Sequence, residues 1–242
     1  MTAVAVGSGY ECHRCGAVAS AGLVRVPRAW GSGGEAMAEA AALPLSFPEA
    51  SIVVCDSLEE QTAAIARGLP QRPLVLGCCC CAHTGAIKGL AARGGRLAVI
   101  WLDAHGDLNT AATSPSGNAW GMPLRVALDE GMVDVSRVAL VGARNLDPPE
   151  AEFIAAAGID DDVERALTTA DGVYVALDAD VLAPGEISCF MPEPGGPSVD
   201  EAVALLQRLA ACGTPLAGMG LTGLRPDADP AALTRITTAV GL

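Results

Sequence analysis

The chain has 242 residues, of which 51% are hydrophobic and 18% are charged, and this balance predicts a compact globular protein rather than a disordered one. Its formal net charge of -13 disfavours nucleic acid as a partner, because phosphates repel an acidic surface. No apolar run is long enough to span a membrane, and the N-terminus shows no basic-then-apolar signal pattern, so we expect a cytoplasmic protein.

The chain holds nine cysteines, an odd number, and four of them are consecutive, at Cys78 to Cys81. Neighbouring cysteines at a strand-to-helix turn are poorly placed for a disulfide framework, so we expect reduced thiols or metal ligands. Near the N-terminus, Cys12 and Cys15 form a single CxxC motif after a strand expected over 3–6. Because no second pair follows at zinc spacing, we favour a loop with reduced thiols over a structural zinc site.

Strand and helix patterns alternate along most of the chain. A short alanine-rich helix is expected over 35–42, a strand over 51–56, and a helix over 58–67 that Gly68 and Pro70 end. Further strands are expected over 74–77, 97–102, 138–141, 173–177 and 216–221, and further helices over 82–93, 123–129, 149–157, 162–169 and 230–240, with one that Ser198 caps and that runs to Ala211. The alternation predicts an α/β fold, with a mainly parallel sheet covered on both faces in a single domain over 1–242.

The apolar strand over 97–102 ends in three potential metal ligands, Asp103, His105 and Asp107. Because they alternate, an extended backbone would direct all three side chains the same way, into the crevice at the end of the sheet. Oxygen and imidazole ligands together suit Mn, Fe, Ni or Zn better than Ca or Mg. The alternative is a strand that ends in a polar turn, with the histidine bonded to a carboxylate.

A second apolar strand, over 173–177, ends in two more carboxylates, Asp178 and Asp180. Two strands that end this way would bring five ionisable groups into one crevice. Like charges this close cost several kcal/mol unless a cation lies between them. One divalent ion cannot neutralise four carboxylates, so the pattern favours two ions over two unrelated acidic strand ends.

Four motifs resemble those of the ureohydrolase family, which includes arginases and agmatinases, and they occur in the same order along the chain. They are Asp103-Ala-His-Gly-Asp-Leu-Asn109, Ser116-Gly-Asn118, Leu177-Asp-Ala-Asp180 and Met191-Pro-Glu-Pro-Gly-Gly-Pro197. The likeness covers roughly residues 74–226. The resemblance implies a three-layer α/β/α fold with a mainly parallel central sheet. It also implies a binuclear manganese site, a small-molecule substrate and a homo-oligomer, either a trimer or a hexamer.

Carried over to this sequence, the family's metal ligands are Asp103 and Asp178 as bridges, Asp107 on one ion, and His105 with Asp180 on the other. The resemblance implies that a hydroxide between the ions attacks a guanidino or amidino carbon and breaks a C–N bond, with Asp103 and Asp178 as the catalytic carboxylates. Family positions that hold an amino-acid-like substrate correspond to Asn109, Ser116, Asn118 and Asp147.

The first departure from the family concerns the remaining metal ligand. The family's GGDH motif aligns without gaps to Gly77-Cys-Cys-Cys80, so that Cys80 replaces a histidine. A thiolate is a soft ligand and shifts the preference from Mn toward Zn, Ni or Fe. His83, one helical turn later, could ligate instead, or the first ion could have one ligand fewer. The cysteines could also simply pack a tight turn as small apolar residues.

Further departures affect the groups that bind and protonate the substrate. Trp120 stands where the family has a histidine thought to shuttle protons, and Gly223 stands where it has an acid that binds guanidinium. Asn145 replaces another acid, and Asp227 lies too far along the chain to be a good substitute for the acid at position 223. Losing a general acid or base costs on the order of 10²–10⁴ in rate.

Five of the six metal-ligand positions keep the residue that the family resemblance implies, whereas the groups that bind and protonate a guanidinium are absent. We therefore expect a metal hydrolase whose substrate lacks a free cationic guanidinium, such as an amidine or a modified guanidine, with Trp120 as a stacking wall. The alternatives are a catalytically silent metal-binding or regulatory homologue, and a protein whose cysteines store metal or sense redox state.

Overall fold

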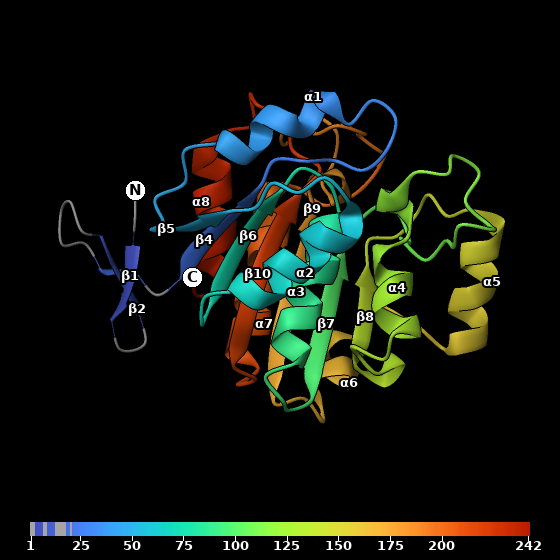
Figure 1. The fold of residues 1–242 in the computed structure, drawn as a ribbon. Coiled ribbons are helices and arrows are strands. Elements are labelled where there is room, and N and C mark those ends of the chain that lie inside the picture. The colour runs from blue at the N-terminus through green and yellow to red at the C-terminus, as the bar shows by residue number, and fades with distance from the viewer. Residues whose placement is uncertain (1–2, 7–8, 13–17, 20) are drawn as a thin grey trace.

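The structure is a computed structural model that describes residues 3–6, 9–12, 18–19 and 21–242 (Figure 1). Three short strands, β1 (Ala3–Val6), β2 (Gly9–Cys12) and β3 (Val18–Ala19), form a small antiparallel sheet. The strand expected over 3–6 is present, although it belongs to this small sheet rather than to the central one. The CxxC motif extends over residues 13–15, which lie outside the described residues.

Seven parallel strands form the central sheet, in the order β5-β4-β6-β10-β9-β7-β8. The strands are β4 (Gly22–Val26), β5 (Glu49–Ile52), β6 (Pro73–Gly77), β7 (Leu97–Leu102), β8 (Val138–Val141), β9 (Gly172–Asp178) and β10 (Leu216–Thr222). Burial on both faces explains why the central strands are continuously apolar. Along β7, for example, Ala98, Ile100 and Leu102 pack on one face of the sheet, and Val99 and Trp101 pack on the other.

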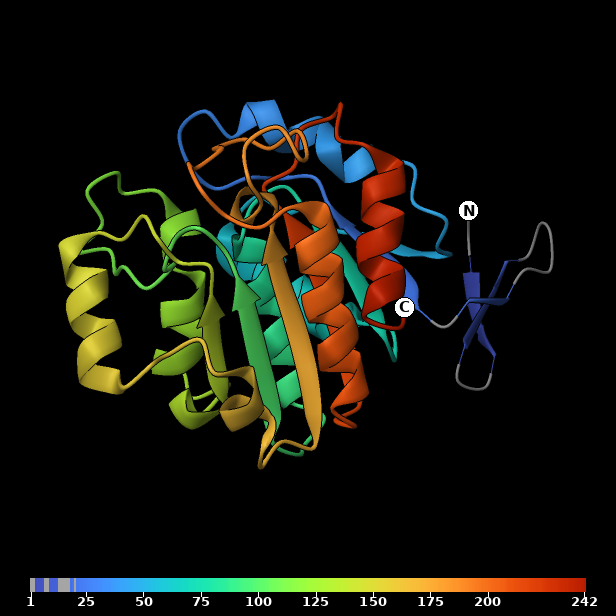
Figure 2. The same cartoon turned by 180° about the vertical axis from the view of Figure 1, so that it is seen from behind.

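Helices cover both faces of this sheet (Figures 1 and 2). One face packs against α2 (Leu58–Gly68), α3 (Cys81–Ala91), α4 (Pro123–Asp129) and α5 (Pro148–Ala157), and the other against α6 (Val163–Leu167), α7 (Val199–Ala211) and α8 (Pro230–Ala239). The three-layer α/β/α fold predicted from the sequence is therefore confirmed. Among the described residues, no helix has both the length and the apolar character needed to cross a membrane.

The first part of the central sheet differs from the prediction. The expected strand over 51–56 is β5, which ends at Ile52, and the chain then leaves the sheet so that Val54 is exposed. Strand β4 was not predicted, because the charged Arg25 interrupts its short apolar run. Its guanidinium is accommodated by Glu49 Oε2 at 2.9 Å and by the carbonyl of Leu43 at 3.0 Å. The helix expected over 35–42 is a single turn of α-helix, α1 (Glu35–Ala38), followed by a 3-10 turn.

Register aligns the ends of the strands that carry polar side chains. In the ladder between β7 and β9, Leu102 pairs with Leu177, so Asp103 and Asp178 follow at the same level. Thr222, at the end of β10, pairs with Asp178 from the other side. Because all these strands are parallel, their carboxyl ends form one edge of the sheet, where open α/β folds place their ligand sites.

Behind this edge lies His83, on α3, which is completely buried. Its Nδ1 lies 2.9 Å from the hydroxyl of Tyr174, and its Nε2 lies 3.1 Å from Oγ1 of Thr222. The ring also packs edge-on against Trp101 at a centroid distance of 5.1 Å. Burial lowers the pKa of His83 to about 3, because the uncharged ring needs no counter-ion in this core.

The buried neutral state of His83 predicts a dependence of stability on pH. Its folded pKa of about 3 lies below the value of about 6.5 typical of an unfolded chain. As the pH falls below about 6.5, only the unfolded chain takes up this proton, so His83 destabilises the fold by about 1.4 kcal/mol per pH unit. In urea titrations, the stability difference between the wild type and His83→Gln should change by about 2 kcal/mol between pH 7 and pH 5. Parallel pH profiles for the two proteins would contradict this assignment.

Candidate metal centre

The end of β7 supplies three of the site's side chains. Asp103 is buried, and it accepts hydrogen bonds from Trp101 Nε1 to Oδ2 at 3.2 Å and from the backbone N–H of His105 to Oδ1 at 2.7 Å, among others. Asp107 has a left-handed backbone with φ of 51°, which is uncommon for a residue other than glycine. Its Oδ2 is buried and has no hydrogen-bond partner among the described residues. A buried oxygen without a hydrogen-bond partner is usually satisfied by a bound cation or a water molecule.

The end of β9 supplies Asp178 and Asp180, which are tied to the neighbouring strands. Asp178 accepts hydrogen bonds from the Asp180 N–H to Oδ1 at 3.1 Å and from Thr222 Oγ1 to Oδ2 at 3.0 Å. Asp180 Oδ1 accepts from the Ala104 N–H at 3.0 Å, and its Oδ2 lies 3.0 Å from His105 Nδ1. These bonds fix the carboxylates of two strands against each other.

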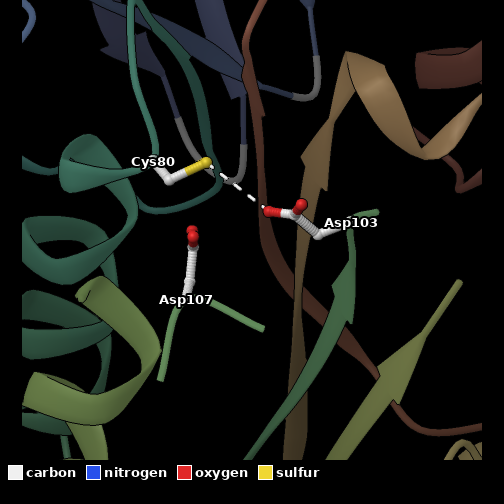
Figure 3. Close-up of side chains that lie close together, drawn as sticks. All are labelled: Cys80, Asp103 and Asp107. Carbon is white, nitrogen blue, oxygen red and sulfur yellow. Dashed lines mark hydrogen bonds between the residues drawn. The ribbon is translucent and has the colours of Figure 1, made fainter. Parts of the chain in front are cut away.

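The turn after β6 brings the thiol of Cys80 to the same place. Its Sγ lies 2.9 Å from Asp178 Oδ2 and 3.7 Å from Asp103 Oδ2. Figure 3 shows that the side chains of Cys80, Asp103 and Asp107 point toward a common space. Asp103 and Asp178 therefore flank one thiol, and they do not face separate regions of solvent.

Within the described residues, two groups of side chains have the geometry to hold a metal ion. Ligand atoms of Cys80, Asp103 and Asp107 all lie within 4.8 Å of one another, and so do those of Asp103, His105 and Asp180. The two groups share Asp103, so two ions held here would be neighbours. His83 is not a donor in either group, because Tyr174 and Thr222 already occupy both of its ring nitrogens.

The electrostatics of these groups favour a cation. Burial, together with the charge of a neighbouring aspartate, raises the pKa of Asp178 and of Asp180 to about 6. Burial and the charges of Asp103 and Asp178 raise the pKa of Asp107 well above its usual value. Burial alone would lower the pKa of His105, but the carboxylates of Asp103 and Asp180 raise it to about 12. The negative charge of these buried carboxylates is therefore only partly compensated, and divalent ions would supply the missing positive charge.

These donors line a cavity of about 230 Å³ with one polar and one apolar side. On the polar side, Asn109 Nδ2 donates to Asp147 Oδ2 at 2.8 Å, and the buried Glu150 accepts from the Leu108 and Asp147 N–H groups at 2.9 and 3.0 Å. The apolar side has Trp120 and Phe190, whose rings meet edge-to-face with centroids 5.9 Å apart, along with the side chains of Met37 and Met191.

The structure brings most of the sequence-predicted site residues to this cavity, but not all. Asn109, Ser116, Trp120 and Asp147 line it. Asn118 does not, because its side-chain oxygen accepts a hydrogen bond from the Ser32 N–H at 2.9 Å, in a neighbouring loop.

Several residues that contribute to the site were not singled out from the sequence. They are Glu150, Thr222, Trp101, Phe190 and Glu193, whose Oε1 lies 3.5 Å from His105 Nε2. Glu150 did have a signal, because Asp147 and Glu150 form a capping box at the start of α5. Glu193 lies within the Met191–Pro197 motif, and Trp101 precedes Asp103 by two residues in β7, but neither side chain was assigned a role. Thr222 and Phe190 come from segments distant in sequence, and no local pattern marks them.

Comparison with known proteins agrees with this architecture. The sequence model described as "Arginase family" matches residues 17–241. Arginase from Brevibacillus brevis is 37% identical over 168 residues, which are 57% of this chain and 56% of that protein. Arginase from Bacillus caldovelox is 36% identical over 184 residues, or 62% of each chain. The chain thus spans about three fifths of the length of the curated relatives it matches.

Solved structures show the same fold at lower sequence identity. The crystal structure of arginase from Bacillus subtilis has a TM-score of 0.79 at 24% identity and covers 92% of this chain and 98% of its own. Formimidoylglutamase from Bacillus subtilis has a TM-score of 0.70 at 19% identity and covers 91% of this chain and 84% of its own. Since the family's sequence model matches nearly the whole chain, the protein belongs to the arginase family.

Proposed function

We propose that the protein is a metal-dependent hydrolase that cleaves a C–N bond in a small guanidino- or amidino-type molecule. The observation that carries this proposal is the pair of donor groups that share Asp103 in the wall of a cavity large enough for a small molecule. Membership of the arginase family supports it, as do structural neighbours named arginase and formimidoylglutamase.

In this proposal, Cys80, Asp103 and Asp107 would hold one divalent ion, and Asp103, His105 and Asp180 would hold the other. Asp178, whose Oδ2 lies 2.9 Å from the Cys80 thiol, would contribute a further carboxylate at this centre. The ions would supply a water of lowered pKa as the nucleophile.

The chain's own groups hold the carboxylates in place. Trp101 and the backbone of His105 orient Asp103, and Thr222 orients Asp178. Each of these donors keeps a lone pair of an aspartate in a fixed direction, so the site needs little rearrangement when it binds a cation. The polar wall then positions the rest of the substrate. Asp147, whose carboxylate is oriented by Asn109, would accept a hydrogen bond from an amino group of the substrate.

The class of substrate is inferred from Gly223, which leaves no room for an acidic side chain at its position. This residue lines the cavity with a φ of 68°, and a Cβ atom built on it would overlap the carboxylate of Asp178. A glutamate at this position therefore has no room while Asp178 keeps its present orientation. Asp227 offers no replacement, because its Oδ1 accepts a hydrogen bond from Ser188 at 2.7 Å and it does not line the cavity.

The aromatic part of the cavity lining, at Trp120 and Phe190, also differs from one built for a charged guanidinium. Trp120 has only an indole N–H, which can donate a hydrogen bond but cannot accept a proton from a substrate. Its ring, supported by Phe190, offers an apolar surface instead. We therefore propose an amidine or an N-substituted guanidine as the substrate, with its uncharged substituent against Trp120.

Plain arginine should be a poor substrate. We expect its turnover to be about 10²–10⁴-fold below that of an amidine or an N-substituted guanidine, because Gly223 offers no carboxylate to bind the guanidinium and Trp120 offers no imidazole to move the proton. Metal-loaded protein would be screened for release of urea, ammonia or amine from arginine, agmatine, N-hydroxyarginine, guanidino acids and amidines. Efficient cleavage of arginine would overturn the substrate class. No cleavage of any compound would favour a catalytically silent homologue.

Metal stoichiometry should separate the shared ligand from the others. Asp103→Asn removes the one carboxylate common to both donor groups, so it should lose both ions. Asp107→Asn and Asp180→Asn each weaken one group and serve as matched controls that should retain one equivalent. Elemental analysis after dialysis measures the metal content, and an Asp103→Asn protein that kept two equivalents would contradict the shared position.

Gly223→Ala should test the close approach of this glycine to Asp178. Gly94→Ala is the matched control, since Gly94 has a φ of 83° but a Cβ atom built on it would meet no other atom within 4 Å. Both variants place alanine in a left-handed conformation, at a cost of roughly 1–2 kcal/mol. Gly223→Ala should lose about 1–3 kcal/mol more, through overpacking, and should also bind metal more weakly. Equal losses of unfolding free energy in urea would refute the steric argument.

A further inference from the structure

The thiol of Cys80 makes the two proposed metal positions chemically different. We propose that Cys80, Asp103 and Asp107 form a thiolate site for a thiophilic divalent ion of the zinc class, whereas Asp103, His105 and Asp180 form a harder site without sulfur. This inference rests on the proposed function only in using the same donor groups. It concerns which ion each group selects, not which substrate is cleaved.

Among the four consecutive cysteines, Cys80 is the one whose thiol contacts the aspartates. The thiol of Cys78 points the other way and donates to the Met37 carbonyl at 3.1 Å. Cys79 and Cys81 hydrogen-bond to each other. The turn between β6 and α3 thus separates one thiol from its neighbours and places it between two carboxylates.

The orphan oxygen of Asp107 is an independent indication of a ligand at this position. Asp107 is only 4% exposed, and its Oδ2 has no hydrogen-bond partner among the described residues. Its side chain points toward the space that Cys80 and Asp103 also face (Figure 3). A bound ion would satisfy this oxygen, which otherwise loses its hydration at a cost of about 1–3 kcal/mol or more.

In the part of the chain that the structure describes, no imidazole competes with the thiol for this position. The nearby His83 uses Nδ1 and Nε2 in its bonds to Tyr174 and Thr222, so it cannot turn toward the aspartates without breaking both. Sulfur ligation favours zinc, cobalt or cadmium over manganese, whereas carboxylate and imidazole ligands accept manganese readily. The Cys80 position should therefore select a zinc-class ion from a mixture, and the His105 position should be less selective.

Cobalt(II) offers a direct readout, because a thiolate bound to it gives a charge-transfer absorption band in the near ultraviolet. We would titrate metal-free full-length protein with cobalt in a Cys15→Ser background, which removes the CxxC pair as a second source of thiolate. We expect a thiolate band that saturates at one equivalent. Zinc should abolish it at stoichiometric concentration, and manganese should do so only at roughly 100-fold excess or more.

Variants assign the band to one sulfur. Cys80→Ser should remove it and weaken zinc binding on the order of 100-fold, and Cys79→Ser, one residue away, should leave both unchanged. Cys80→His should lose the band and bind manganese more tightly relative to zinc. The proposal would be overturned by a band that survives Cys80→Ser, by bound cobalt without a band, or by equal affinity of the wild type for zinc and manganese.

X-ray absorption of the zinc-loaded wild type needs no variant, so it remains informative if a variant fails to fold. It should detect one sulfur at about 2.3 Å from zinc. A coordination shell of nitrogen and oxygen alone would refute the thiolate site. None of these measurements depends on turnover, so a protein that binds zinc through Cys80 but hydrolyses nothing would disprove the proposed function and leave this inference standing.

Discussion

The site depends on the crowding of buried aspartates at the ends of two adjacent parallel strands. The pairing of Leu102 with Leu177 places Asp103 and Asp178 at one level, and none of the described residues that line the cavity they share is a lysine or an arginine. Backbone N–H groups and the Trp101 indole offset part of this negative charge by donating hydrogen bonds. The remaining negative charge is costly to bury without a counter-ion, and this cost is the physical basis for the proposed metal site.

The features that could be predicted from the sequence are those encoded within single segments. The apolar run of β7 and its alternating ligands lie within eleven residues, so the strand, its end and the direction of Asp103 follow from one local pattern. The same is true of β9 with Asp178 and Asp180. That both clusters meet follows from the general rule that parallel strands end at one edge, without knowledge of the register.

What could not be predicted depends on contacts between distant segments. Thr222 looks like an ordinary strand residue, and only the pairing of β10 with β9 brings its hydroxyl to Asp178. Asn118 lies in a motif that suggested substrate binding, yet it turns to the Ser32 loop, whose position the sequence does not specify. Strand β4 was missed because the charge of Arg25 is satisfied by Glu49, 24 residues away.

The hydrogen bonds around His83 have a consequence for how the site can be observed. The carboxylate of Asp178 can only accept hydrogen bonds, so the Thr222 hydroxyl must donate its proton to it. The oxygen of Thr222 must then accept a hydrogen bond from His83 Nε2, which therefore carries the ring proton. The unprotonated Nδ1 accepts a hydrogen bond from the Tyr174 hydroxyl. All three protons therefore point the same way, and the ring is locked in a single tautomer. A change in the charge of Asp178 alters these hydrogen bonds and so reaches the buried imidazole of His83. The ¹⁵N resonances of His83 therefore provide an internal probe of events at the site.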